Sequence, residues 1–153
     1  MPIRPATPAD IPLMRALELQ ADTAAHWAER EYDALFAPDT PKRIALVASE
    51  SGEDITGFLI ARCGLDEDEW EIENVVVDIR RRRGGIGTAL VDQLRLQAGK
   101  ARVPALLLEV RESNTAARRL YEKIGFSEVG RRPAYYQNPA EDALLLKYSV
   151  SFL

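Results

Sequence analysis

The chain has 153 residues, of which 46% are hydrophobic and 29% are charged, and its formal net charge at pH 7 is −4. This length predicts a single domain over residues 1–153, and the composition excludes a chain that is disordered throughout. The chain has one cysteine and one histidine, which excludes a disulfide framework and a metal site built from several such ligands. Its negative net charge disfavours direct binding to nucleic acid and allows attraction to a basic peptide.

The first residues lack the apolar segment of a signal peptide. No apolar run approaches the ~20 residues that cross a membrane. We therefore expect a cytoplasmic protein without membrane contact.

The first half of the chain predicts a strand, two helices and a hairpin. Thr7 and Pro8 favour the start of a helix, because threonine caps free N–H groups and proline fits the first turn. Pro38 and Pro41 close the second helix, and Ser-Gly-Glu at 51–53 is typical of a hairpin turn. The predicted elements are a strand at 3–6, helices from Thr7 and at 27–36, and strands at 44–49 and 55–61.

The second half predicts a βαβ unit with parallel strands, followed by a helix and two strands. Val75, Val76 and Val77 do not alternate with polar residues, which indicates a strand buried on both faces. The predicted apolar side of the central helix carries Leu90, Val91, Leu94 and Leu96. The predicted elements are strands at 70–78 and 105–110, helices at 88–101 and from Ser113-Asn114 to Gly125, and strands at 126–130 and 143–150 joined by a loop around 135–142.

This order, β-α-α-β-β-β-α-β-α-β-β, predicts an α+β or mixed α/β domain built on one sheet. Within it, the segment Arg-Arg-Arg-Arg-Gly-Gly-Ile-Gly at 80–87 is the most informative motif. Glycines between a strand and a helix leave backbone N–H groups free at the positive helix end, where a phosphate can bind. The P-loop lysine is missing, and Leu90 stands where a dinucleotide fingerprint needs Gly or Ala.

The residues alone leave two interpretations of this motif open. The glycines can form a plain permissive turn beside a solvated arginine run. Alternatively, they cradle an anion whose phosphates the arginines bind.

The motif resembles the Arg/Gln-x-x-Gly-x-Gly/Ala signature of the GNAT N-acetyltransferases, with Arg82 where the family often has Gln. Leu-Glu-Val-Arg-Glu-Ser-Asn at 108–114 and Leu-Tyr-Glu-Lys-Ile-Gly-Phe at 120–126 resemble the ribosomal-protein-alanine N-acetyltransferases, the RimI type. The resemblance is tight from 73 to 148 and looser before. It implies a GNAT-like domain, with a mostly antiparallel sheet that contains a parallel βαβ unit and is flanked by helices.

The resemblance also implies that acetyl-CoA is the co-substrate. Its pyrophosphate would lie on the glycine loop and its pantetheine arm along the preceding strand. Asn114 would contact the cofactor in addition to capping a helix. The residues that the resemblance assigns to acetyl-CoA are Val75, Val76, Val77, Arg82, Arg83, Gly84, Gly85, Ile86, Gly87, Thr88 and Asn114.

In this resemblance Glu109 is the general base, and Tyr121 is the general acid that protonates the departing CoA thiolate. A thiol with a pKa of about 8.5 needs only modest help from a phenol with a pKa of about 10. Tyr135 and Tyr136, expected in the last loop, would line the slot for the acceptor. From the residues alone, Glu109 can also be a solvated strand end, Tyr121 a core aromatic, and the two loop tyrosines packing residues.

The implied reaction is direct transfer of acetyl from acetyl-CoA to the α-amine of a protein N-terminus, such as the N-terminal alanine of a basic ribosomal protein. An α-amine with a pKa of about 7.7–8.0 is about a tenth neutral at pH 7, whereas a lysine amine at about 10.4 is almost fully protonated. Two alternatives stay open: a GNAT acetyltransferase for a small amine or a lysine side chain, and a CoA-binding module without turnover. The pair Glu109 and Tyr121 argues against the second.

Overall fold

The computed structural model describes residues 2–20, 29–37, 42–50, 54–66, 68–82, 84–137 and 140–151. The predicted turn at 51–53, the helix start at 27–28, the prolines at 38 and 41, and Arg83 lie outside these ranges. The elements are β1 (Ile3–Pro5), the 3-10 turn η1 (Pro8–Asp10), α1 (Ile11–Gln20), α2 (Glu29–Ala34), β2 (Arg43–Ala48), β3 (Gly57–Asp66), β4 (Glu69–Val77), the 3-10 turn η2 (Ile79–Arg81), α3 (Ile86–Lys100), β5 (Ala105–Arg111), α4 (Thr115–Ile124), β6 (Ser127–Tyr136) and β7 (Glu141–Ser149).

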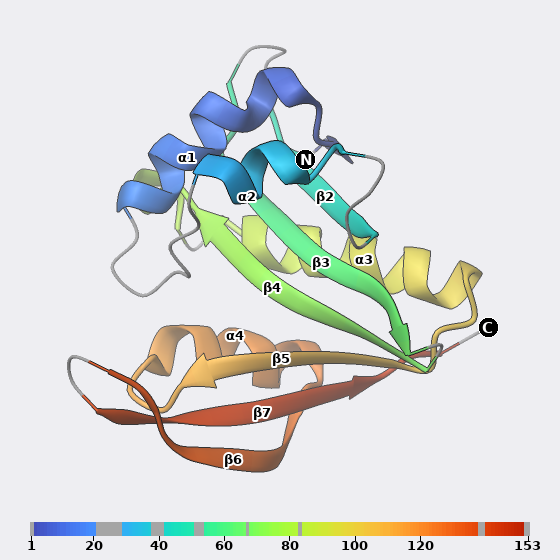
Figure 1. The fold of residues 1–153 in the computed structure, drawn as a ribbon, viewed down its shortest axis with the longest axis vertical. Helices are drawn as coiled ribbons and strands as arrows, with labels where there is room; N and C mark the ends of the chain where they lie inside the picture. The colour runs from blue at the N-terminus through green and yellow to red at the C-terminus, as the bar shows by residue number, and fades with distance from the viewer. Residues whose placement is uncertain are drawn as a thin grey trace.

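One sheet of seven described strands, in the order β1-β2-β3-β4-β5-β7-β6, organises the molecule. Every neighbouring pair is antiparallel except β4 and β5, which run parallel and are joined through α3. The predicted order of elements and the predicted βαβ unit are therefore confirmed. In Figure 1, α3 and α4 lie behind the sheet, whereas α1 and α2 lie in front of β3 and β4.

Each face of the sheet buries an apolar cluster. The larger cluster lies under α3 and α4 and includes Leu90 and Leu94, both fully buried. The second cluster joins α1 and α2 to the other face through Met14 and Tyr32. Leu96, predicted on the apolar side of α3, is 61% exposed, because it lies two residues beyond Leu94 and so about 200° around the helix.

A β-bulge in β4 decides which side chains face which cluster. Ala61 of β3 pairs with Ile72 and Ile60 pairs with Asn74, so Glu73 is the extra residue between them. An extra residue reverses the alternation of the strand. Ile72 faces the larger cluster before the bulge, whereas Val75 and Val77 do so after it and Val76 joins the second cluster. The prediction that the three valines are covered on both faces is confirmed.

Among the described residues, no helix is long and apolar enough to cross a membrane.

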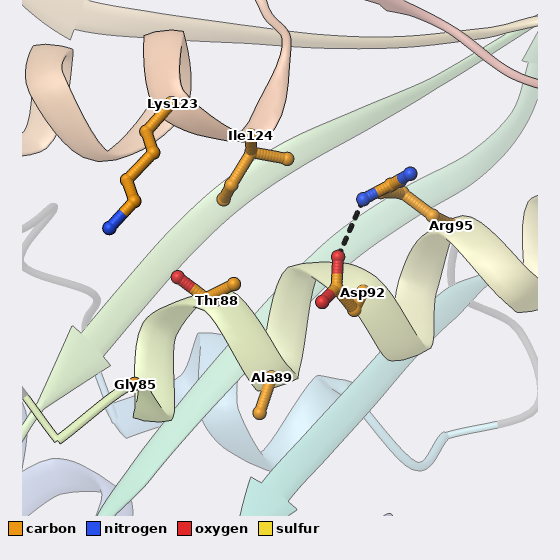
Figure 2. Close-up of a pocket in the computed structure, with 7 residues that line it drawn as sticks. All are labelled: Gly85, Thr88, Ala89, Asp92, Arg95, Lys123 and Ile124. Carbon is orange, nitrogen blue, oxygen red and sulfur yellow. Dashed lines mark hydrogen bonds and ion pairs between the residues drawn. The ribbon is translucent and has the colours of Figure 1, made fainter.

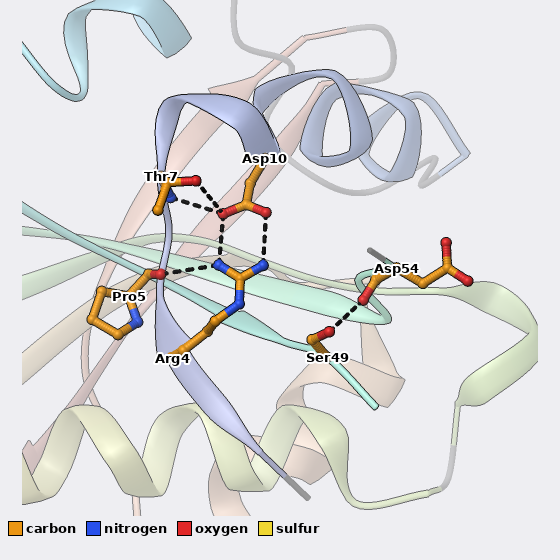
Figure 3. A network of polar contacts seen from close by, with 6 residues as sticks. All are labelled: Arg4, Pro5, Thr7, Asp10, Ser49 and Asp54. Atoms are coloured by element: carbon orange, nitrogen blue, oxygen red, sulfur yellow. Dashed lines mark hydrogen bonds and ion pairs between the residues drawn. The ribbon is translucent and has the colours of Figure 1, made fainter. Parts of the chain in front are cut away.

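The α1 helix is held to β1 by one ion pair (Figure 3). The Arg4 guanidinium donates two hydrogen bonds of 2.8 Å to the Asp10 carboxylate, which also accepts one from the Thr7 backbone N–H. The predicted helix start after Thr7 is therefore a 3-10 turn, which leads into α1 at Ile11.

We expect Asp10→Asn to lower the free energy of unfolding by about 1–2 kcal/mol at pH 7. The hydrogen bonds from Arg4 lower the pKa of Asp10 from 3.8 to about 2. Because the folded pKa lies below the unfolded one, this stabilisation is full above pH 4 and is lost as the pH falls toward 2. Urea unfolding of both proteins at pH 7 and pH 2.5 measures it.

The matched control is Glu50→Gln, since Glu50 pairs with Arg81 and both side chains are 51% exposed. Its effect should stay below about 0.5 kcal/mol. If Asp10→Asn lowers the free energy of unfolding equally at both pH values, the ion pair is not the cause of the loss.

Candidate active site

The parallel strands β4 and β5 pair only along their first residues. The register joins Glu69–Ile72 to Ala105–Leu108, and beyond this point the two strands diverge (Figure 1). Val75, Val76 and Val77 still pair with β3 on their other side. One edge of β4 therefore presents backbone N–H and C=O groups to a gap, where an extended ligand can hydrogen-bond to them. A role of the three valines in holding a pantetheine arm stays a prediction.

The glycine loop leads from this gap into α3. Gly85 has a φ of +80°, a left-handed conformation that glycine adopts without strain, and it caps the helix. The sequence predicted that this helix begins at Thr88. Because Gly85 caps it, the helix begins two residues earlier, at Ile86. The N–H groups of its first turn lack helical acceptors and lie at the positive end of the helix dipole. This arrangement suits a phosphate.

The glycines of the loop have different roles. A Cβ at Gly87 would lie 3.1 Å from the Leu120 side chain, so this glycine lets α3 approach α4. A Cβ at Gly85 would meet nothing within 4 Å, so only the backbone conformation requires glycine there. At Gly84 a Cβ would contact the Arg81 carbonyl oxygen at 3.3 Å. The sequence pattern did not distinguish these roles.

The arginines of the loop also differ. Arg80 pairs with Asp78 at 3.1 Å and Arg81 with Glu50 at 3.0 Å. Arg82 is exposed and makes no ion pair or hydrogen bond with any described residue. Of the arginines that the structure describes in this loop, Arg82 is therefore the one without an ion-pair partner, and its role in holding the cofactor stays a prediction.

A hollow of about 500 Å³ lies beside the start of α3, between it and α4 (Figure 2). The Lys123 side chain of α4 extends toward Thr88 over the first turn of α3, and Arg95 lies further along the helix, paired with Asp92 at 2.6 Å. Sequence analysis did not single out Lys123, although it lies in the block at 120–126. The lining residues are Gly85, Thr88, Ala89, Asp92, Arg95, Lys123 and Ile124.

These residues fit coenzyme A. Free N–H groups and the cations of Arg82 and Lys123 match its phosphates, and the edge of β4 that no longer pairs with β5 offers backbone groups to its extended arm. No group of His, Cys, Asp or Glu side chains within the described ranges could hold a metal ion.

Glu109 lies on β5 just past the point where the two strands separate. Its side chain is 19% exposed, and its Oε1 lies 3.3 Å from the Arg132 guanidinium of β6. Leu108 and Val110, on either side, face the larger cluster, so Glu109 points to the opposite face. Tyr136 lies near Glu109. Burial raises the pKa of the Tyr136 hydroxyl most, and the negative charge of Glu109 raises it further.

Tyr121 lies on the other side of β5. Its ring belongs to the larger cluster and packs edge-on against Phe126, with ring centroids 5.5 Å apart. Burial raises the pKa of its hydroxyl, which makes no hydrogen bond with the residues that the structure describes. The interpretation of Tyr121 as a core aromatic therefore holds for its ring, while its hydroxyl has no evident structural role.

Asn114 caps α4, as predicted, because its side-chain oxygen accepts a hydrogen bond of 3.2 Å from the Ala117 N–H. A contact between Asn114 and the cofactor stays a prediction.

The prediction of a loop around 135–142 is wrong at its start. Tyr135 and Tyr136 end β6, because Tyr136 still pairs with Glu141 of β7 after a register shift.

The rings of Tyr135 and Tyr136 form an edge-on pair with centroids 5.2 Å apart. The Arg111 guanidinium lies 4.2 Å above the Tyr136 ring. Tyr136 therefore shares the face of Glu109, whereas Tyr135 is 50% exposed.

Comparison with known proteins gives consistent results. The model of the acetyltransferase (GNAT) family matches residues 13–126. The ribosomal protein bS18-alanine N-acetyltransferase of Escherichia coli strain K12 is 33% identical over 144 residues, 93% of each chain. The crystal structure of the ribosomal-protein-S18-alanine N-acetyltransferase from Escherichia coli superposes with a TM-score of 0.82 at 30% identity, covering 99% of this chain and 95% of that one. The crystal structure of Ard1 from Thermoplasma volcanium superposes with a TM-score of 0.85 at 26% identity, covering 98% of this chain and 97% of that one.

We expect Gly85→Val to raise the dissociation constant of coenzyme A at least tenfold in isothermal titration calorimetry. A β-branched residue resists the left-handed conformation at this position, so the first turn of α3 shifts away from the phosphates. A thermal melt confirms that the variant is folded.

The control is Gly130→Ala on β6, where a Cβ would lie 3.1 Å from the Leu145 side chain, on the strand at the sheet edge beyond β7. It should cost some stability and leave coenzyme A affinity within twofold. Unchanged affinity in a folded Gly85→Val protein would remove the loop from the cofactor site.

Proposed function

The chain belongs to the acetyltransferase (GNAT) family, and from this premise we propose that it acetylates the α-amine at the N-terminus of a protein. It is an acetyl-CoA-dependent N-acetyltransferase; the proposal concerns the acceptor. The observation that carries it is the 33% identity, over 93% of both chains, to an enzyme named for the alanine of ribosomal protein bS18. The proposed acceptor is accordingly the N-terminal alanine of such a ribosomal protein.

We propose that Glu109 and Tyr121 act from opposite sides of the gap. Acetyl-CoA lies between β4 and β5 and supplies the activated acetyl group. The acceptor nitrogen attacks the thioester carbon directly, so a C–N bond forms as the C–S bond breaks. Glu109 takes the proton that the nitrogen loses, the sulfur takes the Tyr121 proton, and exchange with solvent restores both side chains.

Two features of the described residues support these roles. The hydroxyl of Tyr121 is free of hydrogen bonds to described residues, and a buried phenol with a raised pKa stays protonated until a thiolate forms. Glu109 is mostly buried and points to the face of the sheet opposite the larger cluster, where its side chain keeps 19% exposure. Backbone groups at the free edge of β4 can polarise the thioester carbonyl.

Synthetic peptides test the acceptor. A peptide that starts with alanine and continues with basic residues should gain one acetyl group on its α-amine, located by tandem mass spectrometry. The same peptide with its α-amine blocked and its lysines free should gain none, because the lysine amines are almost fully protonated at neutral pH. Acetylation of the blocked peptide would identify a lysine side chain as the acceptor and overturn the proposal.

Two substitutions that keep side-chain shape test the proton transfers. Glu109→Gln and Tyr121→Phe should each lower kcat at least tenfold. Tyr121→Phe should leave the melting temperature within about 2 °C and the KM for acetyl-CoA within about twofold, because no described residue hydrogen-bonds to the hydroxyl that it removes. Full turnover in Tyr121→Phe would reduce this tyrosine to a packing residue.

A further inference from the structure

Glu71 is a second carboxylate at the point where β4 and β5 separate. It pairs in register with Leu107, two residues before Glu109, and residues two apart on a strand share a face. Ile72 beside it faces the larger cluster, so Glu71 points to the opposite face. The two carboxylates therefore lie on one face, Glu71 just before and Glu109 just past the last paired residues, Ile72 and Leu108.

The two carboxylates whose charges act on Glu71 each have a cation. Glu73 is bound by Arg43 at 2.7 Å, and Glu109 lies 3.3 Å from Arg132. Glu71 makes no hydrogen bond or ion pair with any described residue. Arg62 stands opposite Glu71 on β3 but makes no ion pair with it, and the Arg62 Nε is buried without a hydrogen-bond partner among the described residues. Glu71 is therefore a partly buried carboxylate without a direct partner in the described part of the chain.

The surroundings of Glu71 favour a cation. Its partial burial raises its pKa, and the charges of Glu109 and Glu73 raise it further, while the more weakly acting charges of Arg62 and Arg132 lower it, so that the pKa stays raised. A positive group placed between Glu71 and Glu109 would relieve this repulsion. A cation already reaches Glu109 here: the Arg132 guanidinium, on a side chain that is 55% exposed, extends to it from β6. A positive side chain thus already reaches the carboxylate beside Glu71 on this face.

We propose that Glu71 determines acceptor specificity by binding the protonated α-amine and holding it beside Glu109. The inference rests on the proposed function and adds to it the recognition of charge. The ammonium group binds Glu71 through a charge-assisted hydrogen bond. Glu109 then accepts one of its protons and passes it to solvent, so that Glu109 is free to take the second proton when the neutral nitrogen attacks. A neutral group of the same shape lacks this attraction. In this account Glu71 positions the acceptor and takes no part in the bond changes.

The test compares two peptides that differ in one group. One starts with alanine, and in the other a hydroxyl replaces the α-amine. Titrated into the protein saturated with coenzyme A, the amino peptide should bind roughly ten- to hundredfold more tightly to the natural protein. Glu71→Gln should reduce this preference to about threefold or less, raise the KM for the amino peptide by a similar factor, and leave kcat within about threefold.

Glu69→Gln is the matched control, since it removes the same charge from the same strand and face, two residues further from Glu109. It should keep the preference. Glu71→Asp, which retains a shorter carboxylate, should keep part of it and guards against a folding defect of the glutamine variant. Equal binding of both peptides by the natural protein, or an unchanged preference in Glu71→Gln, would overturn the inference.

These outcomes are separable from failure of the proposed function. Binding requires no turnover, so the preference is measured whether or not the peptide is acetylated. If the natural protein acetylates the free α-amine while Glu71→Gln keeps the preference, the function stands and the inference falls. If the natural protein acetylates only the α-amine-blocked peptide, the function falls, and the binding titrations still decide the role of Glu71.

Discussion

The separation of β4 from β5 is the constraint on which the rest of the site depends. A parallel pair that continued to the ends of both strands would satisfy the backbone groups along this edge and leave no opening for a ligand. Instead, pairing stops at Ile72 and Leu108, and the glycine loop and α3 continue from the freed end of β4. The free edge of β4 and the position of Glu109 just past the last paired residues are thus consequences of one break in one ladder, and the turn that we propose binds phosphate follows on the same strand.

β5 separates the two side chains that the proposed reaction requires. Alternation along this strand turns Glu109 to the face opposite the cluster that contains Tyr121. A donor that lies in the gap therefore meets the acceptor on one face and the phenol on the other. In the proposed reaction, the arriving amine and the departing thiol need not share a path, and the proposed acid can stay in a dry environment while the proposed base lies on the other side of the strand.

Sequence patterns predicted the order of elements, the βαβ unit and the Asn114 cap, because each depends on local periodicity or on a capping side chain. They missed features that depend on register or on an unusual dihedral angle. The bulge at Glu73 requires knowledge of the partner strand, the earlier start of α3 requires the left-handed Gly85, and β6 reaches Tyr136 only through its pairing with β7. Glu71 and Lys123 carry no local signal, since their significance comes from neighbours on other elements.

The ion pair between Arg132 and Glu109 bears on how the product leaves. In the proposed reaction, an arriving ammonium group competes with this guanidinium for the Glu109 carboxylate. Acetylation converts the ammonium into a neutral amide, which no longer competes. Arg132 then returns to Glu109 without opposition, so the charge lost in the reaction favours release, and accumulated acetylated protein should inhibit the enzyme only weakly.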